Sequence, residues 1–110
     1  MRRTPNIVFA ALFFANTTSA FAEADDSALL ERGRELATSL CGSCHAVGTD
    51  DASSVEGAPA FRDLGQSYPV DDLSEALAEG IVTGHEDMPE VALEPADIDA
   101  LLGYIEHIQK

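Results

Sequence analysis

The segment CGSCH at residues 41–45 constrains this chain more than any other feature. It contains both cysteines of the sequence, Cys41 and Cys44, and His45 follows the second one directly. Two thiols and an imidazole at this spacing are compatible with a redox disulfide, with part of a metal site and with covalent attachment of a haem. The choice among them depends on the compartment and on the surrounding fold.

Residues 1–22 have the organisation of a cleavable secretory signal peptide. The segment begins with Arg2 and Arg3, continues with the apolar run IVFAALFFA, and ends in SAFA, where Ala20 and Ala22 fit the small-x-small cleavage pattern. The run is shorter than the roughly 18 apolar residues of a transmembrane helix. We therefore expect cleavage after Ala22 and export to a bacterial periplasm, where thiols meet an oxidising environment.

The remaining residues, 23–110, are expected to form one small, strongly acidic domain without a membrane span. Four basic residues would stand against 20 acidic ones, a formal net charge of −16. This charge excludes nucleic acid as a natural ligand, is typical of a soluble monomer and favours partner proteins with a basic surface. Only Phe61, Tyr68 and Tyr104 would remain as aromatic residues, so a bound apolar group would help to complete the core.

The hydrophobic pattern predicts three helices and no strand. The first is predicted over residues 26–40, with caps from residues 25–27 and a buried stripe formed by Leu29, Gly33, Leu36 and Leu40. The second begins after Asp72, which forms a capping-box pattern with Glu75.

The third predicted helix starts at Pro95, a residue suited to the first helical position. Its apolar face consists of Ile98, Leu101, Leu102, Ile105 and Ile108. Residues 48–68 and 83–94 are rich in Gly, Pro, Ser and Asp and are predicted to be loops.

A helical setting favours haem attachment over the other uses of the two cysteines. A thioredoxin-like site would follow a strand in a larger α/β chain. A zinc site would require the neighbours Cys44 and His45 to converge on one ion together with Cys41 and His85, and a disulfide between residues 41 and 44 would constrain little. In haem attachment the sulfurs bond to the porphyrin, and the adjacent imidazole lies under the iron.

Four segments together resemble small, single-haem class I cytochromes c of bacteria, across nearly all of residues 23–110. The segment ERGRELATSLCGSCH resembles the first helix and haem motif, and GAPAFRDL resembles the loop that supports the axial histidine. EALAEGIVTGHEDMPE resembles the methionine-ligand segment, and DIDALLGYIEHI resembles the closing helix. The resemblance implies an all-α fold around one haem c, covalently bound through Cys41 and Cys44, with the first and last helices crossing at Gly33.

One departure from the family pattern concerns the helix crossing. The family often has an aromatic residue four positions before the first cysteine, and Ala37 occupies that position here. We expect Leu36 and Tyr104 to fill the space.

The resemblance also implies the residues that hold the iron. His45 and Met88 would be the axial ligands, and the Pro59 carbonyl would accept the ring N–H of His45. His85 competes with Met88 as the second ligand, because imidazole also binds haem iron.

With both axial positions filled, the protein would be an electron carrier and not an enzyme. An acidic cluster, Glu86, Asp87 and Glu90, brackets Met88 and would steer redox partner proteins that present a basic docking patch. Two alternatives remain: a haem sensor or ligand-binding haem protein with labile or absent Met88 ligation, and a haem-free thiol–disulfide oxidoreductase that uses Cys41 and Cys44.

Overall fold

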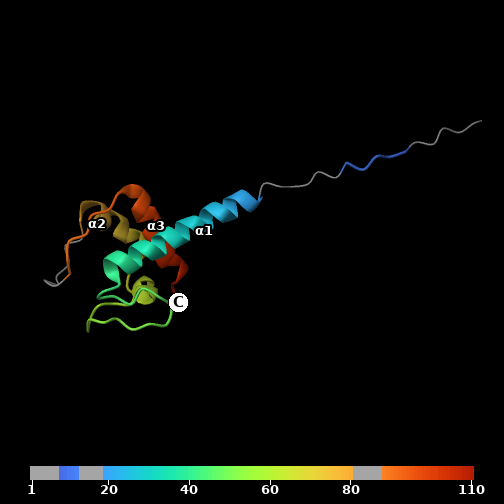
Figure 1. The fold of residues 1–110 in the computed structure, drawn as a ribbon. Coiled ribbons are helices and arrows are strands. Elements are labelled where there is room, and N and C mark those ends of the chain that lie inside the picture. The colour runs from blue at the N-terminus through green and yellow to red at the C-terminus, as the bar shows by residue number, and fades with distance from the viewer. Residues whose placement is uncertain (1–7, 13–18, 81–87) are drawn as a thin grey trace, which may run out of the picture.

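The computed structural model describes residues 8–12, 19–80 and 88–110, and within them the secondary structure is entirely helical. The elements follow the order α1 (Ser19–Leu36), a π-helical turn η1 (Ala37–Cys41), the short 3-10 helices η2 (Phe61–Gln66) and η3 (Val70–Asp72), α2 (Leu73–Glu79) and α3 (Pro95–His107). Figure 1 shows α1 crossing α3, with α2 on the far side of α3 from the amino-terminal half of α1. The prediction of an all-α fold is confirmed for the described residues.

The crossing of α1 and α3 depends on the missing side chain of Gly33. A Cβ atom at this position would overlap the carbonyl oxygen of Ala100 and would lie 2.6 Å from Cβ of Tyr104. Both Ala100 and Tyr104 are buried, and Leu36 and Ala37 are buried on the other helix. The two backbones therefore approach at the glycine, as predicted, and Leu36 and Tyr104 lie in the core beside the small Ala37.

The apolar face of α3 forms most of the core. All five residues predicted for this face are buried: Ile98, Leu101, Leu102, Ile105 and Ile108. Pro95 occupies the start of the helix as predicted. At the same end, Nε and Nη2 of Arg32 donate to Oδ1 of Asp97 over 3.2 and 3.1 Å, which links α1 to the first turn of α3.

The first helix differs from its prediction at both ends. It begins at Ser19, so residues 25–27 lie within the helix and do not cap it; the alanine-rich segment before them has a high helix propensity. At the other end the backbone widens into η1, which turns Ala37 into the core and leaves Leu40 with 42 % of its surface exposed. Leu29 is also exposed, so only Gly33 and Leu36 of the predicted stripe are buried.

The predicted loop over residues 48–68 contains a helix that the sequence pattern did not reveal. In η2 the threefold repeat of a 3-10 helix places Phe61 and Leu64 on the same side, and both are buried. Residues 88–94 are without helix, as predicted, and residues 83–87 lie outside the described part.

The predicted capping box at the start of the second helix does not form. Asp72 stands at the N-cap of α2, but its φ and ψ of −64° and −15° are helical, and its side chain makes no capping hydrogen bond. An N-cap side chain reaches the helix amides from an extended backbone, and here η3 leads directly into α2.

Replacing Gly33 by alanine should destabilise the protein by about 1–3 kcal/mol, because the added methyl group overpacks a backbone contact. Urea unfolding of the haem-loaded protein measures this change. The matched control is Gly103→Ala in α3, where a Cβ would meet no atom within 4 Å. This control should raise stability by up to about 1 kcal/mol through helix propensity, and equal effects of the two substitutions would contradict the crossing described above.

Candidate functional site

The CGSCH segment forms a tight turn directly after η1. The carbonyl oxygen of Cys41 accepts hydrogen bonds from the amides of Cys44 and His45 over 3.2 and 2.9 Å. Both thiols are half-buried, they are not joined by a disulfide, and Cys41 packs against the core. One turn of the chain therefore presents two thiols and an imidazole together.

Burial raises the pKa of the Cys41 thiol. Because the thiolate is the nucleophile in thiol–disulfide exchange, a thiol held in its protonated form is poorly suited to that chemistry. Its local environment therefore does not activate the Cys41 thiol for that chemistry.

The orientation of the His45 ring is set by two neighbours from the next loop. Nδ1 lies 2.7 Å from the carbonyl oxygen of Pro59, which can only accept, so this nitrogen carries the ring proton. The Phe61 ring lies at a centroid distance of 5.2 Å and is tilted by 41°. The proton on Nδ1 leaves Nε2 with a free lone pair, the state of a histidine that ligates a metal.

A second set of hydrogen bonds anchors the chain that follows His45. The amide of Ala46 donates to Oγ of Ser53 over 2.9 Å, and its carbonyl accepts from the amide of Phe61 over 2.9 Å. The hydroxyl of Tyr104 donates to the Val47 carbonyl over 2.6 Å, which ties this loop to α3.

Asp51 holds the same loop from its other side. Its carboxylate accepts from the amides of Val47 and Gly48 over 3.1 and 3.0 Å, and it pairs with Arg62 at 3.3 Å. No sequence pattern marked Ser53, Asp51 or Arg62 as part of the site. Asp51 accepts from amides that precede it by three and four residues, a pattern with no specific signal in the sequence, because a polar residue in a loop has many possible partners.

Met88 is half-buried and lies at the start of the described segment that follows α2. Further along this segment the amide of Leu93 donates to the Leu77 carbonyl over 2.8 Å, which attaches the segment to α2. Pro89 and Glu90 are exposed. His85, Glu86 and Asp87, predicted as a competing ligand and as part of the acidic cluster, lie outside the described residues.

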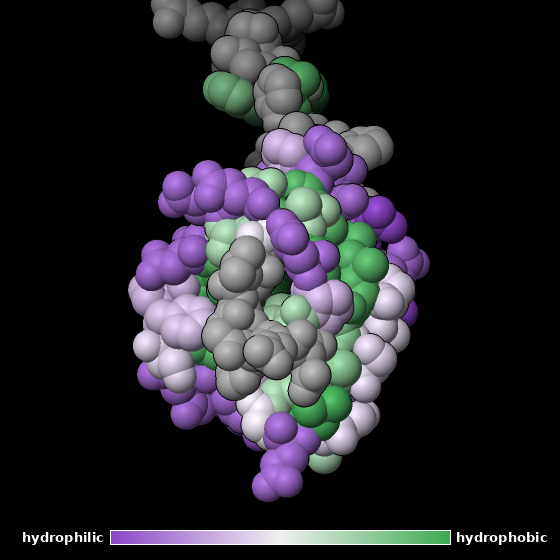
Figure 2. Space-filling view, turned by 90° about the vertical axis from the view of Figure 1, so that its left-hand side faces the viewer, coloured by the Kyte–Doolittle hydropathy of each residue, from purple (hydrophilic) through white to green (hydrophobic). Residues whose placement is uncertain are grey.

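The donor set and its surroundings fit a large apolar group. Among the residues described, no three His, Cys, Asp or Glu side chains lie close enough together to hold a metal ion. The half-buried apolar side chains packed against the core are Cys41, Val47, Leu73 and Leu93. Figure 2 shows one face of the protein on which hydrophobic residues, in green, gather beside hydrophilic ones, in purple. Thiols for covalent attachment, an imidazole nitrogen and an apolar surround are what haem requires.

The family model for cytochrome c matches residues 30–109. The chain belongs to the cytochrome c family. This confirms the family predicted from the four segments, and with it the all-α cytochrome c fold. Neither the curated proteins nor the solved structures compared with the chain gave a match.

Membership of the cytochrome c family establishes the cofactor and the general activity. The protein contains covalently bound haem c, and Cys41 and Cys44 have the spacing of its attachment motif. Cytochromes c are typically electron carriers that exchange electrons with redox partner proteins. In the described part of the chain, none of the helices has the length and hydrophobicity needed to span a membrane.

The hydrogen bond from Tyr104 to Val47 predicts a particular dependence of stability on pH. Burial is the main cause of the raised pKa of Tyr104. Arg34 lowers this pKa, whereas the carboxylates of Asp51 and Glu31 raise it further. The folded protein thus favours the neutral phenol. The contribution of this phenol to the free energy of unfolding is fully present below the ordinary tyrosine pKa of about 10 and is lost as the pH rises above it.

Tyr104→Phe should therefore lower the free energy of unfolding by about 1 kcal/mol at pH 7, the value of one hydrogen bond. The difference in free energy of unfolding between the two proteins should shrink above about pH 10. At such pH the unfolded state of the unsubstituted protein is stabilised by ionisation of Tyr104, and the phenylalanine variant has no such group. Urea unfolding at both pH values tests this, and a deficit that stays constant would contradict it.

Proposed function

We propose that the mature protein, residues 23–110, is a periplasmic one-electron carrier in which His45 and Met88 are the axial ligands of the haem iron. The observation that supports this most directly is the 2.7 Å contact between Nδ1 of His45 and the Pro59 carbonyl. It leaves Nε2 free to bind iron, in the same turn as the two cysteines of the attachment motif.

The residues around His45 account for a stable ligand on one side of the iron. The Pro59 carbonyl holds the ring proton, which orients the imidazole and increases its basicity. Phe61 lies against the ring and limits its rotation. When bound, haem supplies a reversible one-electron change, and the ligating side chains influence its potential.

Met88 is the best candidate for the second ligand. It is the only methionine outside the proposed signal peptide, and it precedes Pro89 on a segment attached to α2. A thioether ligand raises the potential of the haem. With both positions filled, small molecules have no free site on the iron, so electron transfer and not substrate turnover is the expected activity.

Export is part of the proposal. Residues 1–22 fit a signal peptide, and cleavage after Ala22 would remove only the first residues of α1. The crossing at Gly33 would remain, because it lies in the part of the helix that is kept. The mature chain would be a monomer on the basis of its charge, which favours soluble, separate molecules.

Replacing Met88 by leucine tests the ligand assignment. The oxidised, unsubstituted protein should show the weak far-red band of iron–thioether bonding, and Met88→Leu should abolish this band and allow carbon monoxide to bind the reduced protein. His85→Leu is the matched control and should leave the band unchanged. Loss of the band in the His85 variant alone, or prompt carbon monoxide binding by the unsubstituted protein, would instead support His85 ligation or a ligand-binding haem.

The charge of the protein suggests how it meets its partners. Basic partner proteins would be attracted to acidic residues near Met88, of which Glu90 is exposed in the described part. Such attraction speeds encounter and weakens as salt screens the charges.

Electron exchange with a cationic cobalt complex should therefore slow with increasing ionic strength, and exchange with ferricyanide should become faster. The paired variant Asp87→Asn with Glu90→Gln should reduce the salt dependence more than the pair Asp25→Asn and Asp26→Asn, which removes the same charge from the amino-terminal part of α1. Rates of stopped-flow oxidation measure this. Equal effects of the two pairs would show that net charge alone acts, without a patch near Met88.

A further inference from the structure

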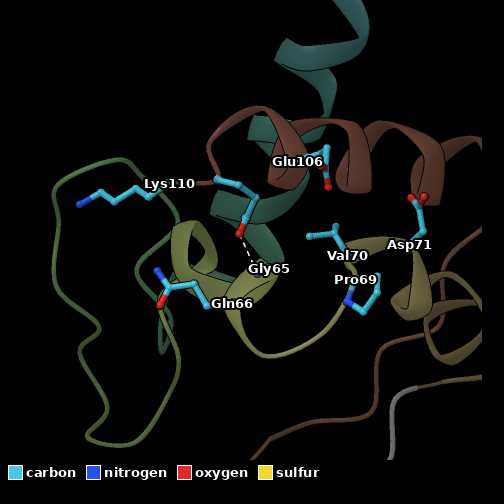
Figure 3. A pocket seen from close by; sticks show the side chains of 8 residues that line it. Gly65, Gln66, Pro69, Val70, Asp71, Glu106 and Lys110 are labelled. Carbon is cyan, nitrogen blue, oxygen red and sulfur yellow. Dashed lines mark hydrogen bonds between the residues drawn. The ribbon is translucent and has the colours of Figure 1, made fainter.

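Gln109, just after α3, joins the end of this helix to both ends of η2. Its Nε2 donates to the carbonyl oxygens of Phe61 and Ile105 over 2.7 and 2.8 Å. Its Oε1 accepts from the amide of Gly65 over 2.7 Å, the bond drawn as a dashed line in Figure 3. One carboxamide thus uses both its donor and its acceptor groups across segments 44 and 48 residues apart.

Gly65 provides the space for this contact. A Cβ atom at residue 65 would lie 2.7 Å from Oε1 of Gln109, closer than side chains pack, and 3.3 Å from its Cδ, a tight contact. The bridge therefore depends on two residues, the glutamine that forms it and the glycine that admits it.

The segment held by Gln109 is the one that orients His45. The amide of Phe61 donates to the Ala46 carbonyl over 2.9 Å, and the Phe61 ring lies against the imidazole. Pro59, whose carbonyl receives the ring N–H, lies two residues before η2. Phe61 is thus bonded on its N–H side to the residue after His45 and on its C=O side to Gln109.

We propose that Gln109 is a positioning residue for His45. By holding η2, it keeps the Pro59 carbonyl and the Phe61 ring where they meet the imidazole. A strong hydrogen bond to Nδ1–H makes Nε2 a better electron donor, which favours the oxidised iron. The inference rests on the proposed function, because it requires His45 to be an axial ligand.

Two substitutions in the haem-loaded protein test the proposal. Gln109→Met removes the bridge without changing charge. Gly65→Ala leaves the glutamine in place but displaces its carboxamide, and a hollow of about 300 Å³ beside Pro69 and Val70 gives that group room to move (Figure 3). An alanine is otherwise well tolerated in a helical backbone, so at least this variant should fold.

Both variants should raise the midpoint potential, because a displaced Pro59 carbonyl binds the ring proton less well. At a fixed potential the ratio of reduced to oxidised protein should rise by about threefold, the factor that corresponds to partial loss of one hydrogen bond. The proton resonance of the His45 ring N–H in the reduced protein should move upfield in both. Redox titration and NMR measure the two effects.

Gln66→Met is the matched control. Gln66 is an exposed glutamine at the end of η2, and its carboxamide makes a long contact of 3.5 Å to Asp63. This substitution should change neither the potential nor the resonance.

The outcomes separate this proposal from the proposed function. The Gln109 and Gly65 variants could unfold more easily and still keep the potential and the ring N–H resonance of the unsubstituted protein. This result would assign the bridge a purely structural role and would overturn the positioning proposal alone. A spectrum of the unsubstituted protein without histidine ligation would overturn both proposals.

Discussion

The close approach of α1 and α3 at Gly33 is the contact on which the rest of the structure depends. It places the end of α1, and the turn η1 that ends in Cys41, against the core that α3 provides. The later part of α3 and Gln109, two residues beyond it, then reach the chain that follows the haem motif, through Tyr104 to Val47 and through Gln109 to Phe61. A single backbone contact between two helices thus sets the frame in which His45 is held.

Features determined by local pattern or by the family motif could be predicted from the sequence, and the remaining contacts between distant segments could not. The buried face of α3 follows from apolar spacing, and the crossing at Gly33 follows from the family resemblance and is explained by side-chain size. In contrast, η2 lies in a segment rich in small and polar residues. Gln109 and Ala46 bond to it from elsewhere in the chain, and such partners leave no periodic trace in the sequence.

The same distinction applies to the site. The cysteines, His45, Pro59 and Met88 were recognisable as a set because their spacing repeats a family motif. The supporting bonds from Asp51, Arg62 and Tyr104 were not, because polar residues in loops have many possible partners. The wrong capping box at Asp72 has a similar origin, since the pattern was present but η3 had already placed the backbone in a helical conformation.

The separation in sequence of these supporting contacts has a consequence for the order of events in biosynthesis. The hydrogen-bond partner of Val47 is Tyr104, 57 residues later in the chain, and that of Phe61 is Gln109, 48 residues later. Because synthesis proceeds from the amino terminus, the CGSCH segment emerges well before the residues that hold the chain following it. Its thiols are therefore open to the covalent chemistry of haem attachment during an interval that closes only when the final residues of the domain are in place.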